Sequence, residues 1–154
     1  MNKLKLEVIK YSKKLNSTNL SALRSGNISI RVKEKGVEGF YITPSGMRYS
    51  KLKIKDIVFI SLKGIFDKKK RKPSSEWRFH QNIYVNKKEA KAIVHAHSTC
   101  STAVSSHQKN IPAFHYMVAV AGGEDLKCAK YATFGTKQLS RNIIKALKNR
   151  TACL

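Results

Sequence analysis

The spacing of apolar residues changes along this 154-residue chain, and these changes restrict its fold more than any other feature. Between residues 4 and 15 apolar side chains return every three or four positions, which predicts an amphipathic helix. Between residues 28 and 32 they alternate with polar ones, which predicts a half-buried strand. Further strands are predicted at residues 39–43, 56–62 and 91–97, and further helices after the pair Ser74-Ser75, at 98–106 and at 139–147.

The order of these elements is not a regular alternation of strand and helix. Such a mixture favours an α/β (α+β) fold, with helices packed on a sheet in a three-layer α/β/α arrangement. The length suits a single domain over residues 1–154, and a content of 42% hydrophobic residues is ordinary for a globular protein with a core.

The chain carries 31 basic residues against nine acidic ones, a formal net charge of +22. Such an excess is typical of proteins that neutralise nucleic-acid phosphates. However, the lysines are spread over the whole length, and the one dense run, Lys68–Lys72, precedes Pro73 as an exposed turn would. No zinc-finger spacing or interleaving of aromatic and basic residues accompanies them. We therefore expect no specific nucleic-acid partner, and a positive field that attracts small anions.

The sequence indicates neither a membrane span nor secretion. No apolar stretch approaches the ~18 residues that a span requires, and residues 1–15 lack the continuous apolar block of a signal peptide. The three cysteines, Cys100, Cys128 and Cys153, are far apart and odd in number, as in reduced cytosolic proteins. We expect a cytoplasmic protein without a membrane partner.

Two histidines separated by one residue lie in the strand predicted at 91–97. Positions i and i+2 of a strand point to the same face, so His95 and His97 are expected to project side by side. Two imidazole nitrogens at ~2.0–2.1 Å from one ion suit Zn²⁺. A pair of polar-face histidines on an exposed strand has the same spacing, so this motif alone leaves both interpretations open.

A helix start supplies a second group of polar side chains. Ser74 and Ser75 precede the predicted helix, whose free N–H groups and dipole favour an anion. Glu76 lies beside them, in reach of acid or base chemistry. The alternative is that the serines only cap the helix and Glu76 only complements its dipole.

Two glycine-containing turns offer further ligand-binding groups. Gly26 lets the backbone approach a ligand closely, and Asn27 beside it supplies both a donor and an acceptor. The turn Thr43–Gly46 adds hydroxyl groups and a second glycine. Most turns of this kind bind nothing, so each is weak evidence by itself.

Taken in order, these motifs resemble the class II aldolase/adducin family over essentially the whole chain. The similar segments are 25–29 (SGNIS), 42–46 (ITPSG), 73–80 (PSSEWRFH), 95–97 (HAH), 111–117 (IPAFHYM) and 131–136 (YATFGT). The resemblance implies a class II aldolase-like three-layer fold with a central, mostly antiparallel sheet. It also implies a lyase that cleaves a carbon–carbon bond in a sugar phosphate and works as a homotetramer.

Within the family, the branch that cleaves L-fuculose 1-phosphate to dihydroxyacetone phosphate and L-lactaldehyde looks most similar. The resemblance gives Glu76 the role of acid and base, Tyr116 that of a proton donor, and His95 and His97 those of zinc ligands, with Glu76 a further candidate ligand. The substrate phosphate would be held by Gly26, Asn27, Ser45, Gly46, Ser74 and Ser75.

Other branches remain as alternatives. L-ribulose-5-phosphate 4-epimerases carry Asp where this chain has Glu76, and a Lys–Pro pair where it has Thr43-Pro44. Sugar-phosphate dehydratases of this fold differ from aldolases in few residues. A non-catalytic module of the adducin kind is also open, although Glu76, both histidines and the serine pair are retained.

The resemblance also implies two features beyond Leu154, the last residue. These are a third histidine ligand, in a motif of the form aliphatic–x–His–Gly, and a C-terminal region that reaches a neighbouring subunit. From this we expect a C-terminally truncated chain with an incomplete sheet, and a weak two-histidine zinc site with impaired activity. The segment 151–154 is expected to begin a strand, and His80, His107 and His115 are expected to serve packing or the surface.

Overall fold

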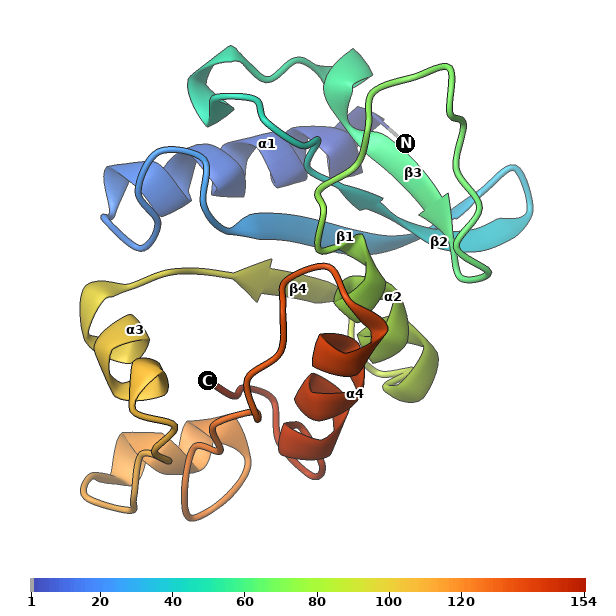
Figure 1. Ribbon diagram of the computed structural model, residues 1–154. Coiled ribbons are helices and arrows are strands. Elements are labelled where there is room, and N and C mark those ends of the chain that lie inside the picture. Colours follow the sequence, from blue (N-terminus) through green and yellow to red (C-terminus); the bar gives the residue numbers. More distant parts are fainter. Residues whose placement is uncertain (1) are drawn as a thin grey trace.

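The computed structural model describes residues 2–154, in which helices lie on both faces of a four-stranded antiparallel sheet (Figure 1). This arrangement confirms the predicted α/β fold. The strand order is β3-β2-β1-β4, so β1 is central and pairs with both β2 and β4. The strands are β1 (Asn27–Glu34), β2 (Val37–Ile42), β3 (Val58–Ser61) and β4 (Ala92–His95), and the helices are α1 (Asn2–Ser17), α2 (Trp77–Asn86), α3 (Thr99–Ser106) and α4 (Lys137–Ala146). Short 3₁₀ helices are η1 (Tyr49–Lys51), η2 (Ile54–Asp56) and η3 (Tyr116–Ala121).

Helix α1 covers one face of the sheet. Its apolar residues Val8 and Leu15 pack in one buried cluster with Ile28 of β1 and Tyr41 of β2. These four side chains have exposed fractions of 4% or less. The apolar period read from residues 4–15 therefore marks the face that meets the sheet, and the predicted helix is confirmed.

Helix α2 covers the opposite face. Strand residues alternate in direction, so Phe40 and Ile42 of β2 point away from α1 and pack with Tyr84 of α2. Helix α4 lies against α2, where Ile83 and Leu147 share a third cluster with Phe79. This face also receives Ser29 of β1, a polar residue that is wholly buried among these helices.

Three local predictions need correction. Strand β4 ends at His95, so His97 lies beyond the strand. Helix α2 starts after Glu76 without a side-chain cap, and Ser74 instead accepts a hydrogen bond from the Glu76 N–H at 3.3 Å through its hydroxyl. Residues 151–154 form no strand within the described part of the chain, because their backbone hydrogen bonds are isolated: Thr151 N–H donates to Ala121 O, and Leu154 bonds with Lys127 and Ala129.

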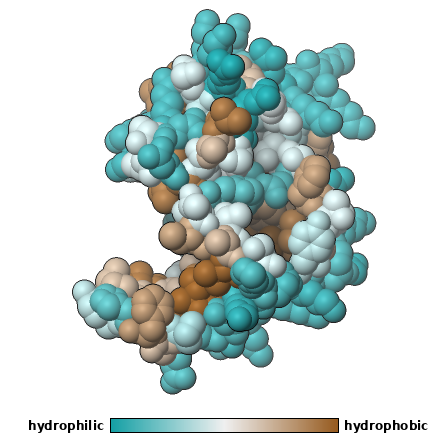
Figure 2. Space-filling view, turned by 60° about the vertical axis from the view of Figure 1, so that its left-hand side comes forward, coloured by the Kyte–Doolittle hydropathy of each residue, from teal (hydrophilic) through white to brown (hydrophobic). Residues whose placement is uncertain are grey.

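The lower part of the molecule, which holds residues 107–136, has little regular structure and a partly apolar surface. Figure 2 shows apolar side chains gathered in the lower part of the visible face. Among the large exposed hydrophobic residues of the chain, Phe114, Tyr116, Met117, Val120, Tyr131 and Phe134 come from this segment. None of the helices in residues 2–154 is long and apolar enough to cross a membrane.

Candidate active site

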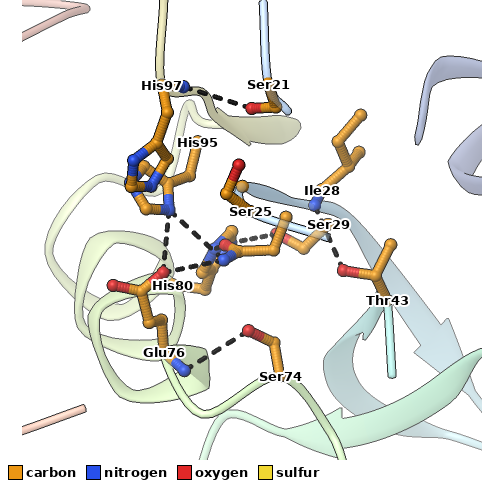
Figure 3. Close-up of polar contacts among 12 residues, drawn as sticks. Ser21, Ser25, Ile28, Ser29, Thr43, Ser74, Glu76, His80, His95 and His97 are labelled. Carbon is orange, nitrogen blue, oxygen red and sulfur yellow. Dashed lines mark hydrogen bonds and ion pairs between the residues drawn. The ribbon is translucent and has the colours of Figure 1, made fainter. Parts of the chain in front are cut away.

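The pairing of β1 with β4 brings together two of the residues predicted for the site. Asn27 and His95 are direct partners in this antiparallel ladder, at the ends where the two strands leave the sheet. Glu76 approaches from the N-terminus of α2, so three elements distant in sequence meet at one point (Figure 3). The pairing of β1 with β4 therefore fixes the distance between Asn27 and His95, which the separate sequence motifs did not define.

The side chain of Asn27 is the centre of this group. Its amide nitrogen lies 2.9 Å from Glu76 Oε2 and 3.2 Å from His95 Nδ1, and its amide oxygen contacts His80 Nε2. The reverse orientation would place two oxygens in contact at Glu76, so this network defines the amide orientation. Because Asn27 is buried with an exposed fraction of 3%, water cannot readily replace these partners.

His80 supports Asn27 by contacting its amide oxygen. Its Nε2 faces the Asn27 oxygen, which only accepts, so Nε2 carries the proton. Its Nδ1 then accepts from the Ser29 hydroxyl at 2.7 Å, and Ser29 accepts in turn from Tyr84 at 2.8 Å. Burial, together with the charge of His95, lowers the pKa of His80 to about 3, whereas Glu76 acts in the opposite direction. His80 is therefore a neutral imidazole that aligns the Asn27 amide.

The carboxylate of Glu76 is paired with His95. Oε2 lies 2.8 Å from His95 Nδ1, and both side chains are largely but not wholly buried. Burial alone raises the pKa of Glu76. The hydrogen bond and charge of His95, together with the hydrogen bond from Asn27, lower it by more, so the pKa of Glu76 is lowered overall. Glu76 Oε1 has no hydrogen-bond partner within residues 2–154, so one carboxylate oxygen remains free for chemistry.

His97 lies next to His95 although it is outside the strand. Its backbone N–H donates to Leu20 O at 2.8 Å and to Ser21 Oγ at 3.1 Å, which holds the segment after β4 against the loop after α1. The ring centroids of His95 and His97 are 4.6 Å apart. Burial, together with the charge of His95, lowers the pKa of His97, which favours the neutral imidazole that binds metals.

Two neighbouring imidazoles are nitrogen donors of the kind that Zn²⁺ prefers. His95 has Nδ1 turned to a carboxylate, which leaves Nε2 as its metal-binding nitrogen and resembles the usual outer support of a histidine ligand. Among the described residues, however, no three His, Cys, Asp or Glu side chains form a group that could hold a metal ion. Imidazole nitrogens are ligands that suit zinc, and within residues 2–154 the two neighbouring candidates are His95 and His97.

Gly26 allows the loop before β1 to approach this site. Its φ of +77° lies in the left-handed region, and an added Cβ would stand 2.5 Å from Ser21 Oγ and 2.6 Å from His95 O. The Tyr49 hydroxyl donates to Gly26 O at 2.5 Å, and burial raises the pKa of Tyr49 to about 12, with the Glu76 charge acting in the same direction. Tyr49 is therefore a neutral donor that ties this loop to the segment after β2.

The two serine-containing segments predicted to bind phosphate run side by side. Pro44 and Pro73 form an isolated antiparallel bridge, in which Ser45 N–H donates to Lys72 O and Ser74 N–H donates to Thr43 O. Thr43 N–H in turn donates to Ile28 O, the residue after Asn27. Backbone pairing thus links the 43–46 turn and the 73–75 segment to the start of β1.

Several donors of these segments are unpaired. Within the described residues, the N–H groups of Gly46 and Ser75 and the hydroxyls of Ser45 and Ser75 donate no hydrogen bond to protein atoms. Ser45, Gly46 and Ser75 are also exposed. Groups of this kind can donate to the oxygens of an anion.

Tyr116 is the predicted site residue that the structure leaves apart. It begins η3, is 78% exposed, and stacks at an angle beside His115 with ring centroids 4.4 Å apart. No hydrogen bond in residues 2–154 joins it to Glu76, His95 or His97. His107 and His115 are exposed, as expected.

The residues that support the Asn27 side chain were not predicted from the sequence. His80 was expected to serve packing, and it does, but it also aligns Asn27 through a bond between side chains. Its position four residues after Glu76 was the available signal, because i and i+4 share one helix face. Nothing in the sequence marked Tyr84 as the end of this chain of hydrogen bonds.

Comparison with known proteins identifies the family of this chain. The family described as Class II Aldolase and Adducin N-terminal domain matches residues 6–154. The chain belongs to the class II aldolase and adducin family.

Named relatives place it among the aldolases of this family. It is 44% identical over 153 residues to "L-fuculose phosphate aldolase" of Escherichia coli (strain K12), with 99% of this chain and 69% of that protein covered. It is 43% identical over 147 residues to "5-methylthioribulose-1-phosphate/5-deoxyribulose-1-phosphate aldolase" of Rhodospirillum rubrum, with 96% and 64% covered. A solved L-fuculose 1-phosphate aldolase matches with a TM-score of 0.91 at 42% identity, covering 99% of this chain and 70% of that one. The class II aldolase fold is thereby confirmed, and the relatives act on more than one ketose phosphate.

Proposed function

We propose that this chain is a metal-dependent class II aldolase that cleaves L-fuculose 1-phosphate to dihydroxyacetone phosphate and L-lactaldehyde. One observation carries the proposal: a Glu76 carboxylate fixed by Asn27 and His95, with one oxygen free, beside two neighbouring imidazoles. This is the arrangement that proton transfer next to a bound sugar requires. The 44% identity to an L-fuculose phosphate aldolase supports the choice of substrate.

The phosphate of the substrate is assigned to Gly26, Asn27, Ser45, Gly46, Ser74 and Ser75. The unpaired N–H groups of Gly46 and Ser75 and the hydroxyls of Ser45 and Ser75 support this role. Gly26 keeps the backbone close without a side chain in the way, and Ser74 holds the N–H of Glu76. Binding at these residues places the sugar next to the carboxylate.

His95 and His97 are the proposed ligands of Zn²⁺, whose contribution is to stabilise, as a Lewis acid, the negative charge that develops on the substrate oxygen. The bond from His95 Nδ1 to Glu76 orients the ring toward this role. The hydrogen bond from the His97 N–H to Ser21 Oγ fixes the segment after β4 and thereby orients His97.

Glu76 is the proposed acid and base. Its free oxygen takes a proton from the substrate hydroxyl as the carbon–carbon bond breaks, and it returns a proton to the carbon of the dihydroxyacetone phosphate fragment. Asn27 and His95 hold the other oxygen and keep the carboxylate ionised at neutral pH. In the reverse, condensation direction Tyr116 is proposed as the proton donor near the aldehyde half.

Release of dihydroxyacetone phosphate from L-fuculose 1-phosphate by the zinc-loaded protein tests the proposal. We expect product formation that stops when zinc is removed with a chelator and returns on its addition. Absence of product at every substrate and zinc concentration would reject the aldolase function.

A ketose 1-phosphate derived from ribulose is the second candidate substrate. It is favoured by the 43% identity to the Rhodospirillum rubrum aldolase, which is close to the value for the L-fuculose phosphate relative. Both compounds give dihydroxyacetone phosphate, so the ratio of kcat/KM for the two substrates in one assay decides between them.

The active form is proposed to be a cytoplasmic homotetramer. The exposed aromatic residues of the segment 107–136 support self-association, because contiguous apolar surface of this kind commonly marks a protein interface.

A further inference from the structure

The residues assigned to the substrate phosphate carry no positive charge. They contribute backbone N–H groups, hydroxyls and one amide, and none is a lysine or arginine. A phosphate ester carries close to two negative charges at neutral pH, and hydrogen bonds from a cation to phosphate are roughly twice as strong as neutral ones. A cation fixed beside these residues would therefore contribute to affinity and to selection of phosphorylated sugars.

Arg24 is such a cation. It lies in the loop between α1 and β1, two residues before Gly26, and its Nη1 donates to Gly46 O at 2.9 Å. The loop itself is held by Asn16, whose side-chain amide donates to Ser21 O at 2.7 Å and to Leu23 O at 3.2 Å. The guanidinium thus joins the two glycine-containing turns assigned to the phosphate.

The charge of Arg24 is not compensated by the protein. Among the described residues Arg24 forms no ion pair, and the bond to Gly46 O is its one side-chain hydrogen bond. Arg71 and Arg150, by contrast, are paired with Asp56 and Asp125. Because a guanidinium has five N–H donors, most of those on Arg24 are available to a ligand.

We propose that Arg24 binds the phosphate group of the substrate and makes the enzyme selective for phosphorylated ketoses. This inference rests on the proposed function, and it assigns a residue of the binding site that the sequence motifs did not indicate. The guanidinium presents planar, paired donors to two phosphate oxygens while its Nη1 holds Gly46. It therefore strengthens binding and fixes the turn that carries a further donor.

The test is the dissociation constant of dihydroxyacetone phosphate, measured by calorimetry on zinc-loaded protein. We expect Arg24→Gln to weaken binding by about tenfold or more, as loss of a charge-assisted hydrogen bond does. Arg24→Lys, which keeps the charge but loses the planar fork, should fall between Gln and wild type. Arg48→Gln is the matched control, because Arg48 is exposed two residues after Gly46 and its side chain forms no hydrogen bond within residues 2–154.

Two readouts separate phosphate binding from a structural role. Affinity of wild type should fall more steeply with added NaCl than affinity of Arg24→Gln, and the two proteins should have the same midpoint of urea unfolding. Equal affinity of Arg24→Gln and Arg48→Gln, or equal salt dependence of wild type and Arg24→Gln, would overturn the assignment.

The affinity measurement and the aldolase assay test the role of Arg24 and the proposed function separately. If wild type releases product and Arg24→Gln keeps wild-type affinity, the proposed function stands and the role of Arg24 is rejected. If affinity depends on Arg24 and no substrate is cleaved, the phosphate site stands and the proposed function is rejected.

Discussion

At the scale of single residues, the site depends on hydrogen bonds whose direction is determined. Asn27 donates through its amide nitrogen to Glu76, whose carboxylate can only accept, and this fixes its oxygen as the acceptor for His80. A buried polar group that loses its partner costs roughly 1–3 kcal/mol. The carboxylate and its supporting residues therefore form one unit, although they come from three different elements.

Replacement of Glu76 by Gln tests the chemical role of this unit. Gln keeps the size of the side chain and an acceptor for Asn27, but it cannot take a proton, so kcat should fall by about 10²–10⁴-fold. KM and the unfolding midpoint should change little. Steady-state kinetics against Glu89→Gln, an exposed carboxylate on the surface, provides the comparison. Retention of wild-type kcat by Glu76→Gln would exclude Glu76 as acid and base.

Buried His80 predicts how stability depends on pH. Because its pKa is lowered to about 3 in the folded protein, it stays neutral there while the unfolded chain takes up a proton below about pH 6.5. Folding stability from this group is therefore complete above pH 6.5 and is lost as pH falls, by up to about 1.4 kcal/mol per unit.

Urea unfolding between pH 7 and 5 measures this effect. The fall in unfolding free energy should be smaller in His80→Gln than in wild type by close to one proton's contribution. His107→Gln, at an exposed position, should keep the wild-type slope. Equal slopes in His80→Gln and wild type would show that His80 takes up no proton on unfolding.

At the scale of elements, the position of β1 between β2 and β4 builds the site. The alternating apolar pattern of residues 28–32 was enough to predict β1, and i, i+4 periodicity was enough to predict α1. The pairing of Asn27 with His95 was not predictable, because these residues are 68 positions apart and the register between such distant strands depends on packing of the whole sheet. For the same reason, the sequence identified the motifs but not the hydrogen bonds among them.

The sequence also failed to predict local geometry at two places where it was compatible with more than one conformation. The pattern of 91–97 suited a strand of seven residues, but β4 ends at His95, where the chain turns toward Ser21. The serine pair suited a helix cap, but Ser74 pairs with Thr43 and leaves Glu76 as the N-cap residue. In both places contacts between distant segments overrode a local preference.

The close approach at Gly26 is testable by comparison of two glycines. Gly26 and Gly36 both have positive φ, of +77° and +82°, but a Cβ meets Ser21 and His95 only at Gly26. Both alanine substitutions should cost backbone strain, and Gly26→Ala should be less stable than Gly36→Ala by about a further 1–3 kcal/mol of steric overlap. Urea unfolding of the two variants measures the difference, and equal destabilisation would contradict the tight contact.

At the scale of the whole molecule, charge and apolar surface are unevenly arranged. The net charge of +22 is spread over the surface, whereas exposed aromatic residues are concentrated in the segment 107–136. Composition predicted the first property, whereas the second was not predicted: the family resemblance implied a homotetramer but did not locate its interface. Tyr116, which forms no hydrogen bond with Glu76 within residues 2–154, belongs to this apolar surface.

The proposed oligomer predicts that this surface is buried between subunits. Tyr131→Ser combined with Phe134→Ser removes two of its exposed aromatic rings, and the sedimentation coefficient should shift toward that of a 17.4 kDa monomer. Exposed Tyr11→Ser on α1, outside the segment, should leave the oligomer unchanged. A wild-type protein that sediments as a monomer at all concentrations would contradict the prediction.

The central claim is that Glu76 moves a proton to and from the carbon of dihydroxyacetone phosphate. The most direct measurement is exchange of that carbon-bound hydrogen with deuterium, followed by NMR with zinc-loaded protein in D₂O and no aldehyde present. We expect replacement of one hydrogen at a single carbon by wild type, and no exchange above background by Glu76→Gln. Exchange at the same rate in both proteins, or in neither, would contradict it.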